Sequence, residues 1–177
     1  MRSTLLTVAL FGVLVVAAQA NAQCSGNAGS CNTSNTASVT IPALVKLGMS
    51  ATTTSLTPPT ADQVDLGATI ADAGPTFTIK ANRSWTLNIR SGNATNWTYV
   101  GANSGVKPIS DLTWANALAG TYAAITASDV LFTSGASASA GTAASAFFKT
   151  NYTAGFTNVA NAPGTYSLPV IFTLTAP

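Results

Sequence analysis

Aspartate is the only acidic side chain in this sequence, and histidine is absent, which limits the chemistry that its residues could perform. Every Ser–His or Cys–His nucleophile is therefore excluded. A glycosidase pair would have to be drawn from Asp62, Asp65, Asp72, Asp111 and Asp129. A sequence alone cannot show the distance between two carboxylates that this mechanism requires. Because the sequence contains no other catalytic arrangement, we predict a protein that is not an enzyme. A secreted hydrolase acting through Asp62, Asp65 or Asp72 is the least favoured alternative.

Three of these aspartates lie close together in the stretch A-D-Q-V-D-L-G-A-T-I-A-D-A-G, which we interpret as a surface loop. Carboxylate oxygens are the hard ligands that calcium prefers, so Asp62, Asp65 and Asp72 are candidates for a calcium site. The spacing of an EF-hand is missing, and acidic residues in loops are usually just solvated. We predict no metal and no cofactor, and calcium bound in the Asp62–Asp72 loop is the open alternative.

The two cysteines, Cys24 and Cys31, lie in C-S-G-N-A-G-S-C near the start of the chain. We predict that they form a disulfide, which would close a terminal loop over residues 23–36. Closing so short a loop would stabilise the fold by about 2 to 3 kcal/mol in the chain-entropy model. A redox role is disfavoured, because the spacing is not the C-x-x-C of redox proteins.

Charge is sparse and nearly balanced along the whole chain. Only 7% of the residues are charged, with seven lysines and arginines against five aspartates. Binding to nucleic acid by counterion release needs a clustered basic patch, whereas these basic residues are scattered along the sequence. We therefore predict that nucleic acid is not a partner.

The first 22 residues have the features of a secretory signal peptide. Arg2 provides the positive start, Leu5 to Ala18 form an apolar run, and small residues follow up to Ala22. The apolar run is too short to span a membrane, which takes about 20 residues. We predict cleavage after Ala22, in A-N-A, with cleavage after Ala20, in A-Q-A, as the alternative. We also predict a secreted or cell-surface protein with no transmembrane span in the mature chain.

The most regular pattern in the mature chain is the stretch F-T-I-K-A-N-R-S-W-T-L-N-I-R, from Phe77 to Arg90. Apolar and polar residues alternate, and only Arg83 breaks the pattern. A period of two places one set of side chains on each face of a β-strand. We predict one long strand, or two strands in phase across a bend near Asn82, with Trp85 and Leu87 facing the core.

Other short apolar or alternating segments indicate further strands, separated by turns rich in Gly, Pro, Asn and Ser. The segment 134–145 contains only small side chains and predicts a flexible loop. The segment 97–100 is expected to pair with the strand before it, and the segment 106–122 is expected to be either a strand or one helical turn. The remaining expected strands cover residues 37–47, 52–56, 130–133, 147–156 and 165–175.

Together these elements predict an all-β fold, with residues 37–177 forming a single antiparallel β-sandwich, immunoglobulin-like or jelly-roll-like. A closed barrel is the alternative. Trp85 and Phe172 are expected to be the largest core residues. Trp97 and Tyr99 are expected in the core as well, and a surface contact to carbohydrate or protein is the alternative for them.

Two short motifs resemble bacterial WxL-type cell-surface domains. These motifs are W-T-L at Trp85 to Leu87 and the closing segment G-T-Y-S-L-P-V-I-F-T-L-T-A-P, which contains Tyr166, Phe172 and Leu174. Phe172 stands where the second tryptophan of that family would be. The resemblance implies a cell-surface β-sandwich that associates noncovalently with a cell-envelope polymer, in that family peptidoglycan, or with other surface proteins.

The N-terminal cysteine region and the closing G-T-Y strand are also similar to spore-coat-U and pilus-type secreted β-sandwich subunits. That likeness implies assembly in which one subunit lends a strand to its neighbour, giving a homo-oligomer, and Asn32 to Thr40 is the candidate donor. The leading hypothesis is a non-enzymatic, envelope-associated or adhesive structural protein. A subunit that polymerises by strand exchange is its alternative.

Overall fold

The computed structural model describes residues 29–177, and the chain divides into two units between Ile41 and Pro42. The predicted signal peptide, over residues 1–22, and Cys24 lie outside the described residues, so both the cleavage and the Cys24–Cys31 disulfide stay predictions. Residues 29–41, named the tail below, contain no helix or strand, and every one of them is exposed. The second unit, Pro42–Pro177, is named the sandwich unit.

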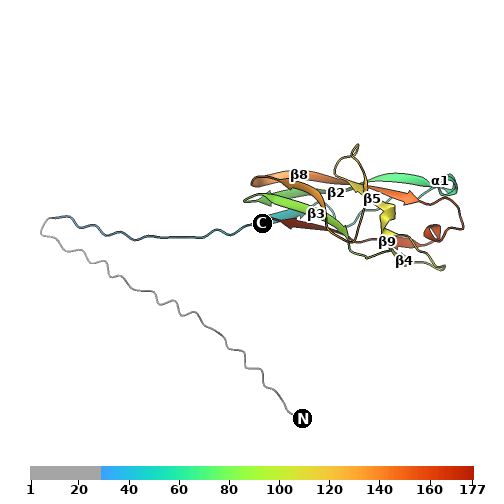
Figure 1. The fold of residues 1–177 in the computed structure, drawn as a ribbon, viewed down its shortest axis with the longest axis horizontal. Coiled ribbons are helices and arrows are strands. Elements are labelled where there is room, and N and C mark those ends of the chain that lie inside the picture. Colours follow the sequence, from blue (N-terminus) through green and yellow to red (C-terminus); the bar gives the residue numbers. More distant parts are fainter. Residues whose placement is uncertain (1–28) are drawn as a thin grey trace, which may run out of the picture. The chain divides into compact units, whose positions relative to one another are not determined.

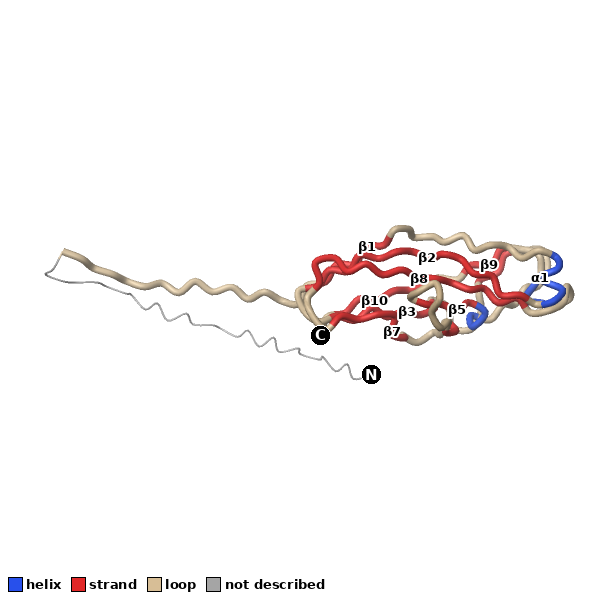
Figure 2. Tube along the Cα trace, turned by 90° about the horizontal axis from the view of Figure 1, so that it is seen from above, coloured by secondary structure: helices blue, strands red, loops and turns tan. Residues whose placement is uncertain are grey.

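The sandwich unit is built almost entirely of antiparallel strands, as Figures 1 and 2 show. A five-stranded sheet has the order β1 (Val45–Met49), β2 (Ala68–Ala81), β8 (Ser139–Tyr152), β5 (Leu112–Ala115) and β6 (Ala123–Ala124). A three-stranded sheet has the order β10 (Val170–Thr175), β3 (Trp85–Ser91) and β7 (Val130–Gly135). The strands β4 (Thr98–Val100) and β9 (Thr165–Ser167) form a separate pair. The prediction of an all-β sandwich is confirmed.

Three short helices complete the unit: α1 (Ala61–Leu66), η1 (Ile109–Asp111) and η2 (Val159–Asn161). The helix α1 lies in the segment that we predicted to be a loop, and its start carries a capping box. Gln63 N donates to the Thr60 side chain, and Thr60 N donates to the Gln63 side chain. The pattern T-x-x-Q is a known signal for a helix start. Gly67 ends the helix with a φ of 72°, which favours glycine.

The alternating stretch at the centre of the sequence forms two strands in phase, β2 and β3, as predicted. Alternate residues of β3 are buried throughout its length. Asn82 fixes the bend between the two strands, because its side chain accepts from Leu44 N at 2.9 Å and donates to Pro42 O at 2.8 Å. The same residue therefore also positions the chain that leads into β1.

The two larger sheets pack on each other through aromatic rings, with Phe77 of β2, Phe132 of β7 and Phe172 of β10 at the centre. Ring centroids of Phe77 and Phe172 lie 4.5 Å apart, and those of Phe77 and Phe132 lie 5.8 Å apart. Trp85 and Leu87 are buried in the same core, with exposed fractions of 3% and 0%. Phe172, Leu174 and Tyr166 pack against it but stay partly exposed.

The predicted strand over 37–47 is shorter in the structure, because only Val45–Met49 pairs with a neighbour. Pro42 lacks a backbone N–H and lies before the start of pairing, which accounts for the late start. The predicted strand over 52–56 was wrong. These residues have no regular structure and run beside β2 without joining its ladder.

The prediction of a flexible loop over 134–145 was also wrong, because β8 begins at Ser139 and pairs with β2 as far as Ala81. Small side chains are required there, since Ala144 lies directly opposite Phe77 in the ladder. Backbone pairing and the space taken by the neighbouring ring outweigh the low strand propensity of alanine and serine. Ser139 strengthens the start of β8 by donating to Ile79 O at 2.8 Å.

The expected pairing of the segment 97–100 with the preceding strand was wrong, because β4 pairs with β9 near the end of the chain. The segment 106–122, predicted to be a strand or a helical turn, contains both features, a helical turn in η1 and a strand in β5. The final segment 165–175 is divided into β9 and β10 on either side of Pro169, in agreement with the irregularity expected at that residue.

Candidate functional site

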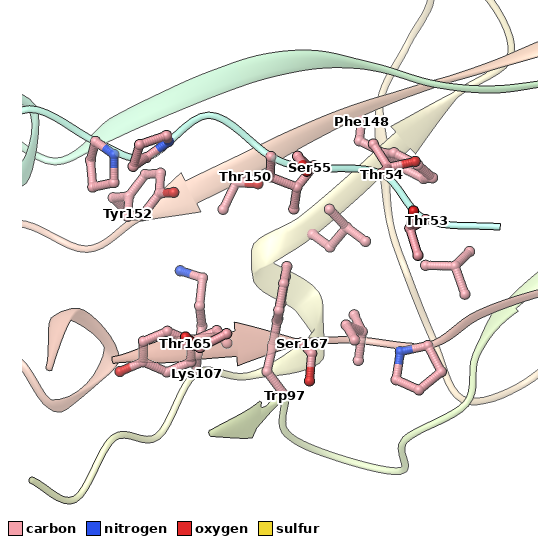
Figure 3. Close-up of a pocket in the computed structure, with 18 of the residues that line it drawn as sticks. Thr53, Thr54, Ser55, Trp97, Lys107, Phe148, Thr150, Tyr152, Thr165 and Ser167 are labelled. Carbon is pink, nitrogen blue, oxygen red and sulfur yellow. The ribbon is translucent and has the colours of Figure 1, made fainter. Parts of the chain in front are cut away.

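A groove of about 980 Å³ lies in the sandwich unit between two chain segments, 49–59 and 163–172. Figure 3 shows part of it, with Thr53, Thr54 and Ser55 along one wall and Thr165 and Ser167 along the other. We name it the open groove. It reaches α1 at one end, where Val64 contributes to its lining.

Core side chains form the floor of the open groove. Trp97, Leu112 and Phe148 are buried residues of the hydrophobic core, and all three line it. Val170 and Phe172 line it as well and stay half-exposed. The core of the sandwich is therefore left partly uncovered along this side.

The first wall of the open groove is a segment whose backbone has no partner. Ser50 N donates to Thr76 O at 2.9 Å, and both Thr57 N and Thr57 Oγ1 donate to the Asp72 carboxylate. Between these two anchors, none of the residues 51–56 makes a hydrogen bond to any other described residue. Their N–H and C=O groups are free to pair with an additional strand.

The second wall consists of β9 and β10, which are both edge strands. β10 pairs with β3 on one side, and β9 pairs with β4 on one side. Across the groove, β1 is in turn the edge of the five-stranded sheet. An extended segment lying between the two walls would therefore find unpaired edges on both sides.

One end of the open groove carries a buried lysine. Lys107 is only 3% exposed. Its Nζ donates to Asp111 Oδ2 at 3.0 Å and to Asn151 O at 2.6 Å, and it lies 4.7 Å from the ring centre of Tyr152. Figure 3 shows the Lys107 side chain projecting between Thr165 and Tyr152. The charge is thus held by a carboxylate, a carbonyl oxygen and an aromatic face.

Two buried polar atoms without a hydrogen-bond partner among the described residues line this same groove. They are Thr150 Oγ1 and Asn161 Oδ1. The other atom of the Asn161 amide is used, because Nδ2 donates to Thr153 O and Gly155 O. Buried polar groups are normally hydrogen-bonded, so these two oxygen atoms are exceptions among the described residues.

Replacing the unpaired hydroxyl should stabilise the isolated protein. Thr150→Val puts a methyl group where a buried hydroxyl has no partner, so we expect the free energy of unfolding in urea to rise by about 1 kcal/mol. Thr113→Val is the matched control, because Thr113 Oγ1 donates to Lys149 O at 3.2 Å. The control should lose about 1 kcal/mol. A loss of stability in Thr150→Val would contradict this description.

Removing the partner of the buried lysine should be costly. Asp111→Ala leaves Lys107 charged inside the unit, and we expect urea unfolding to show a loss of about 3 kcal/mol. The double variant Lys107→Met with Asp111→Ala should lose less, because it removes the uncompensated charge as well. A single variant that loses less than the double variant would show that the pair is not buried in solution.

Both tyrosines that line the open groove have a raised pKa. Burial raises the pKa of Tyr152, with a further contribution from the negative charge of Asp72. Burial also raises the pKa of Tyr166, together with the neighbouring Tyr99, while its hydrogen bond to Ala162 O lowers it. Both hydroxyl groups therefore remain protonated donors at neutral pH, Tyr152 toward Thr57 O and Tyr166 toward Ala162 O.

The two aromatic residues singled out in the sequence as core or contact residues lie near this groove. Trp97 is a buried part of its floor, with Nε1 donating to Pro108 O at 3.0 Å. Tyr99 packs on Tyr166, with ring centroids 4.8 Å apart, and donates to Pro163 O. By contrast, Trp85 and Leu87 of the W-T-L triplet are buried in the core and have no exposed face for a ligand.

The three clustered aspartates do not form a joint site. Asp62 and Asp65 are exposed on α1, whereas Asp72 belongs to β2 and is held by Thr57. Within residues 29–177, no group of three or more metal-binding side chains comes together. Nor does that part of the chain contain a helix long and apolar enough to cross a membrane.

Neither the open groove nor the burial of Lys107 was predicted from the sequence. No local sequence pattern predicts a groove between two edge segments, because its two walls come from parts of the chain that lie far apart in the sequence. For Lys107 one signal was present, namely an aspartate four residues later that could pair with it. That signal would not have shown that the pair is buried.

No family model matches this sequence, and no curated protein matches it. Among solved structures, the chain is similar to a chain of a chaperone–usher pilus, from work described as revealing the molecular basis of rod uncoiling. The TM-score is 0.46 at 11% sequence identity, and the alignment covers 88% of this chain and 100% of that chain. A likeness this weak supports no conclusion, so the proposed function rests on the open groove.

Proposed function

We propose that this protein is an exported structural subunit that polymerises by strand exchange, with the tail of one copy lying in the open groove of the next. The observation that carries this proposal is a sandwich whose core is uncovered between two unpaired edges. An additional strand would cover the apolar floor and pair with the free backbone groups of both walls.

The tail has the side chains that such a strand needs. Val39 and Ile41 are 85% and 70% exposed, although both are large apolar residues. They lie two positions apart, so in an extended segment they point to the same side. Ser38 and Thr40 lie on the other side, as expected for a strand with one face toward a core and one toward water.

The length of the tail also fits. The wall over residues 163–172 contains ten residues, which span about 33 Å in an extended strand. The tail segment from Thr33 to Ile41 contains nine residues. A single strand from a second copy would therefore cover the groove along most of its length.

Strand exchange of this kind joins two different surfaces, the tail of one copy and the groove of another. Such head-to-tail contacts close into rings or continue as open filaments. The predicted signal peptide would place this assembly outside the cytoplasm, as a non-enzymatic, cell-surface structure. The predicted Cys24–Cys31 disulfide would brace the chain ahead of the strand that is exchanged.

A free peptide provides the test. The peptide of residues 32–41 should occupy open grooves and shorten the polymers that the full exported chain forms, as seen by size-exclusion chromatography. The same peptide with Val39→Asp and Ile41→Asp should have no effect, because it cannot fill the apolar floor. Polymers of unchanged length at a large excess of the first peptide would contradict the proposal.

A further inference from the structure

The charged residues of the sandwich unit fall into two groups, those with a partner and those without. Lys107 pairs with Asp111, and Arg90 pairs with Asp129. Lys149 lies over the ring of Tyr122, and Asp72 is hydrogen-bonded by Thr57. The side chains of the remaining charged residues have no hydrogen bond or ion pair to other described residues: Lys46, Lys80, Arg83, Asp62 and Asp65.

These unpartnered charges are separated by sign along the sandwich unit. Lys46 and Lys80 lie near the start of β1 and the end of β2, and Arg83 lies in the bend that follows. Asp62 and Asp65 lie on α1, which directly precedes β2. Figure 2 shows α1 at one end of the unit and the start of β1 toward the other. We name these ends the acidic end and the basic end.

The two ends cannot neutralise each other within one copy. β2 connects them with 14 residues, which span about 45 Å in an extended strand. Screening at physiological salt reduces charge interactions beyond about 8 Å. Within the unit, each end is therefore a local excess of one sign.

The positive charges at the basic end also repel one another. Lys46 and Lys80 are paired directly across β1 and β2, with both side chains exposed on the outer face of the sheet. Like charges in directly opposite positions destabilise a sheet. No carboxylate of the described residues lies within ion-pair distance to relieve this repulsion. An acidic partner would do so.

We infer that the basic end of one copy docks on the acidic end of the next, through Lys46, Lys80 and Arg83 facing Asp62 and Asp65. This inference rests on the proposed strand exchange. The tail joins the sandwich unit at Pro42, just before β1 and next to the basic end. The open groove reaches α1 at the acidic end, through Val64. A tail entering from α1 therefore brings the two ends together.

The contact also sets the direction of the exchanged strand. β10 ends at Thr175, opposite Thr86 near the start of β3 and therefore toward the basic end. A tail that enters at α1 keeps Ile41 near the acidic end and places Thr33 deeper. It therefore runs antiparallel to β9 and β10, as the strand pairs of this structure do. Along the other wall it runs parallel to residues 51–56, because the chain from Ser50 to Thr57 runs antiparallel to β2 from Thr76 to Asp72.

Two charge-reversed full-length chains test the inference. Asp62→Lys with Asp65→Lys makes both ends basic, and Lys46→Asp with Lys80→Asp and Arg83→Asp makes both ends acidic. Each alone should polymerise about tenfold more slowly than the wild type at low salt, measured by light scattering after dilution from denaturant. An equal mixture should polymerise faster than either variant alone and recover about half of the wild-type rate, because only a junction between the two different variants joins opposite charges. High salt should reduce these differences.

The control adds positive charge away from both ends. Ala117→Lys with Ala119→Lys, in the exposed loop between β5 and β6, should change the rate less than twofold. If the charge-reversed chains polymerise at the wild-type rate and with the wild-type salt dependence, the inferred charge contact is wrong. The proposed strand exchange still holds in that case, as long as Val39→Asp with Ile41→Asp blocks assembly. If that tail variant assembles as well, the proposed function itself fails.

Discussion

A chain carrying Val39→Asp and Ile41→Asp is expected to fold with wild-type stability and to remain monomeric. Both side chains are exposed in the single copy, so the fold loses nothing when they change. In the open groove, each would bury an apolar side chain worth about 1.5 to 3 kcal/mol. Their combined loss corresponds to at least a hundredfold weaker assembly, and a buried carboxylate adds a further penalty.

Ser38→Asp with Thr40→Asp is the matched control for this variant. It adds the same charge at neighbouring positions, but on the face of the strand that points away from the groove. We expect this control to polymerise, and size-exclusion chromatography with negative-stain microscopy separates the two results. If both variants lose assembly equally, the effect comes from negative charge on the tail and does not depend on which face of the strand carries it.

The second large effect concerns the core itself, at Trp85. Truncation by Trp85→Ala should lower the free energy of unfolding by about 3 to 5 kcal/mol, because the ring is almost fully buried. Gly135 of β7 packs directly on the ring, since a Cβ built there would lie 2.5 Å from Trp85 Nε1. Urea unfolding measures the loss.

Thr86→Ala is a useful comparison for Trp85→Ala, because Thr86 is the next residue on the same strand and points the other way. Its Oγ1 shares a hydrogen bond with Thr175 Oγ1 at 3.1 Å, and we expect a loss of about 1 kcal/mol. A negligible loss in Trp85→Ala would place the ring at the surface. Trp85 would then be a candidate ligand contact.

The parts of the fold that could be predicted from sequence are those in which the type of each residue indicates whether it is buried or where a strand ends. Along β2 and β3 the alternation from Phe77 to Ile89 determines the buried face. Pro169 marks the break between β9 and β10. The start of α1 was also readable from Thr60 and Gln63, although we interpreted that segment as a loop.

Other parts of the fold depend on residues far apart in the chain. The low-complexity start of β8 is ordered by its pairing with β2, and Ala144 is suited to its place because Phe77 lies opposite. β4 pairs with β9, more than sixty residues later. No local pattern in these segments specifies the partner, so propensity alone gave the wrong answer for both.

Of the two parts of the candidate site, only the donor strand could be predicted from the sequence. The tail was visible in the sequence, where Asn32 to Thr40 was identified as the candidate donor strand. The acceptor was not, because the open groove is formed by two edges that approach each other only after folding. The hydrogen bonds that Thr150 and Asn161 lack are a property of the three-dimensional arrangement and leave no trace in the sequence.

Crosslinking between labelled and unlabelled copies tests the central claim most directly. One chain is labelled with ¹⁵N and carries photo-leucine in place of Val39, and it is polymerised together with unlabelled wild-type chains before irradiation. Strand exchange predicts mixed-isotope adducts on residues 163–172 or 49–59 of the unlabelled copy. Adducts found only within the labelled chain, or only outside these two segments, would contradict it.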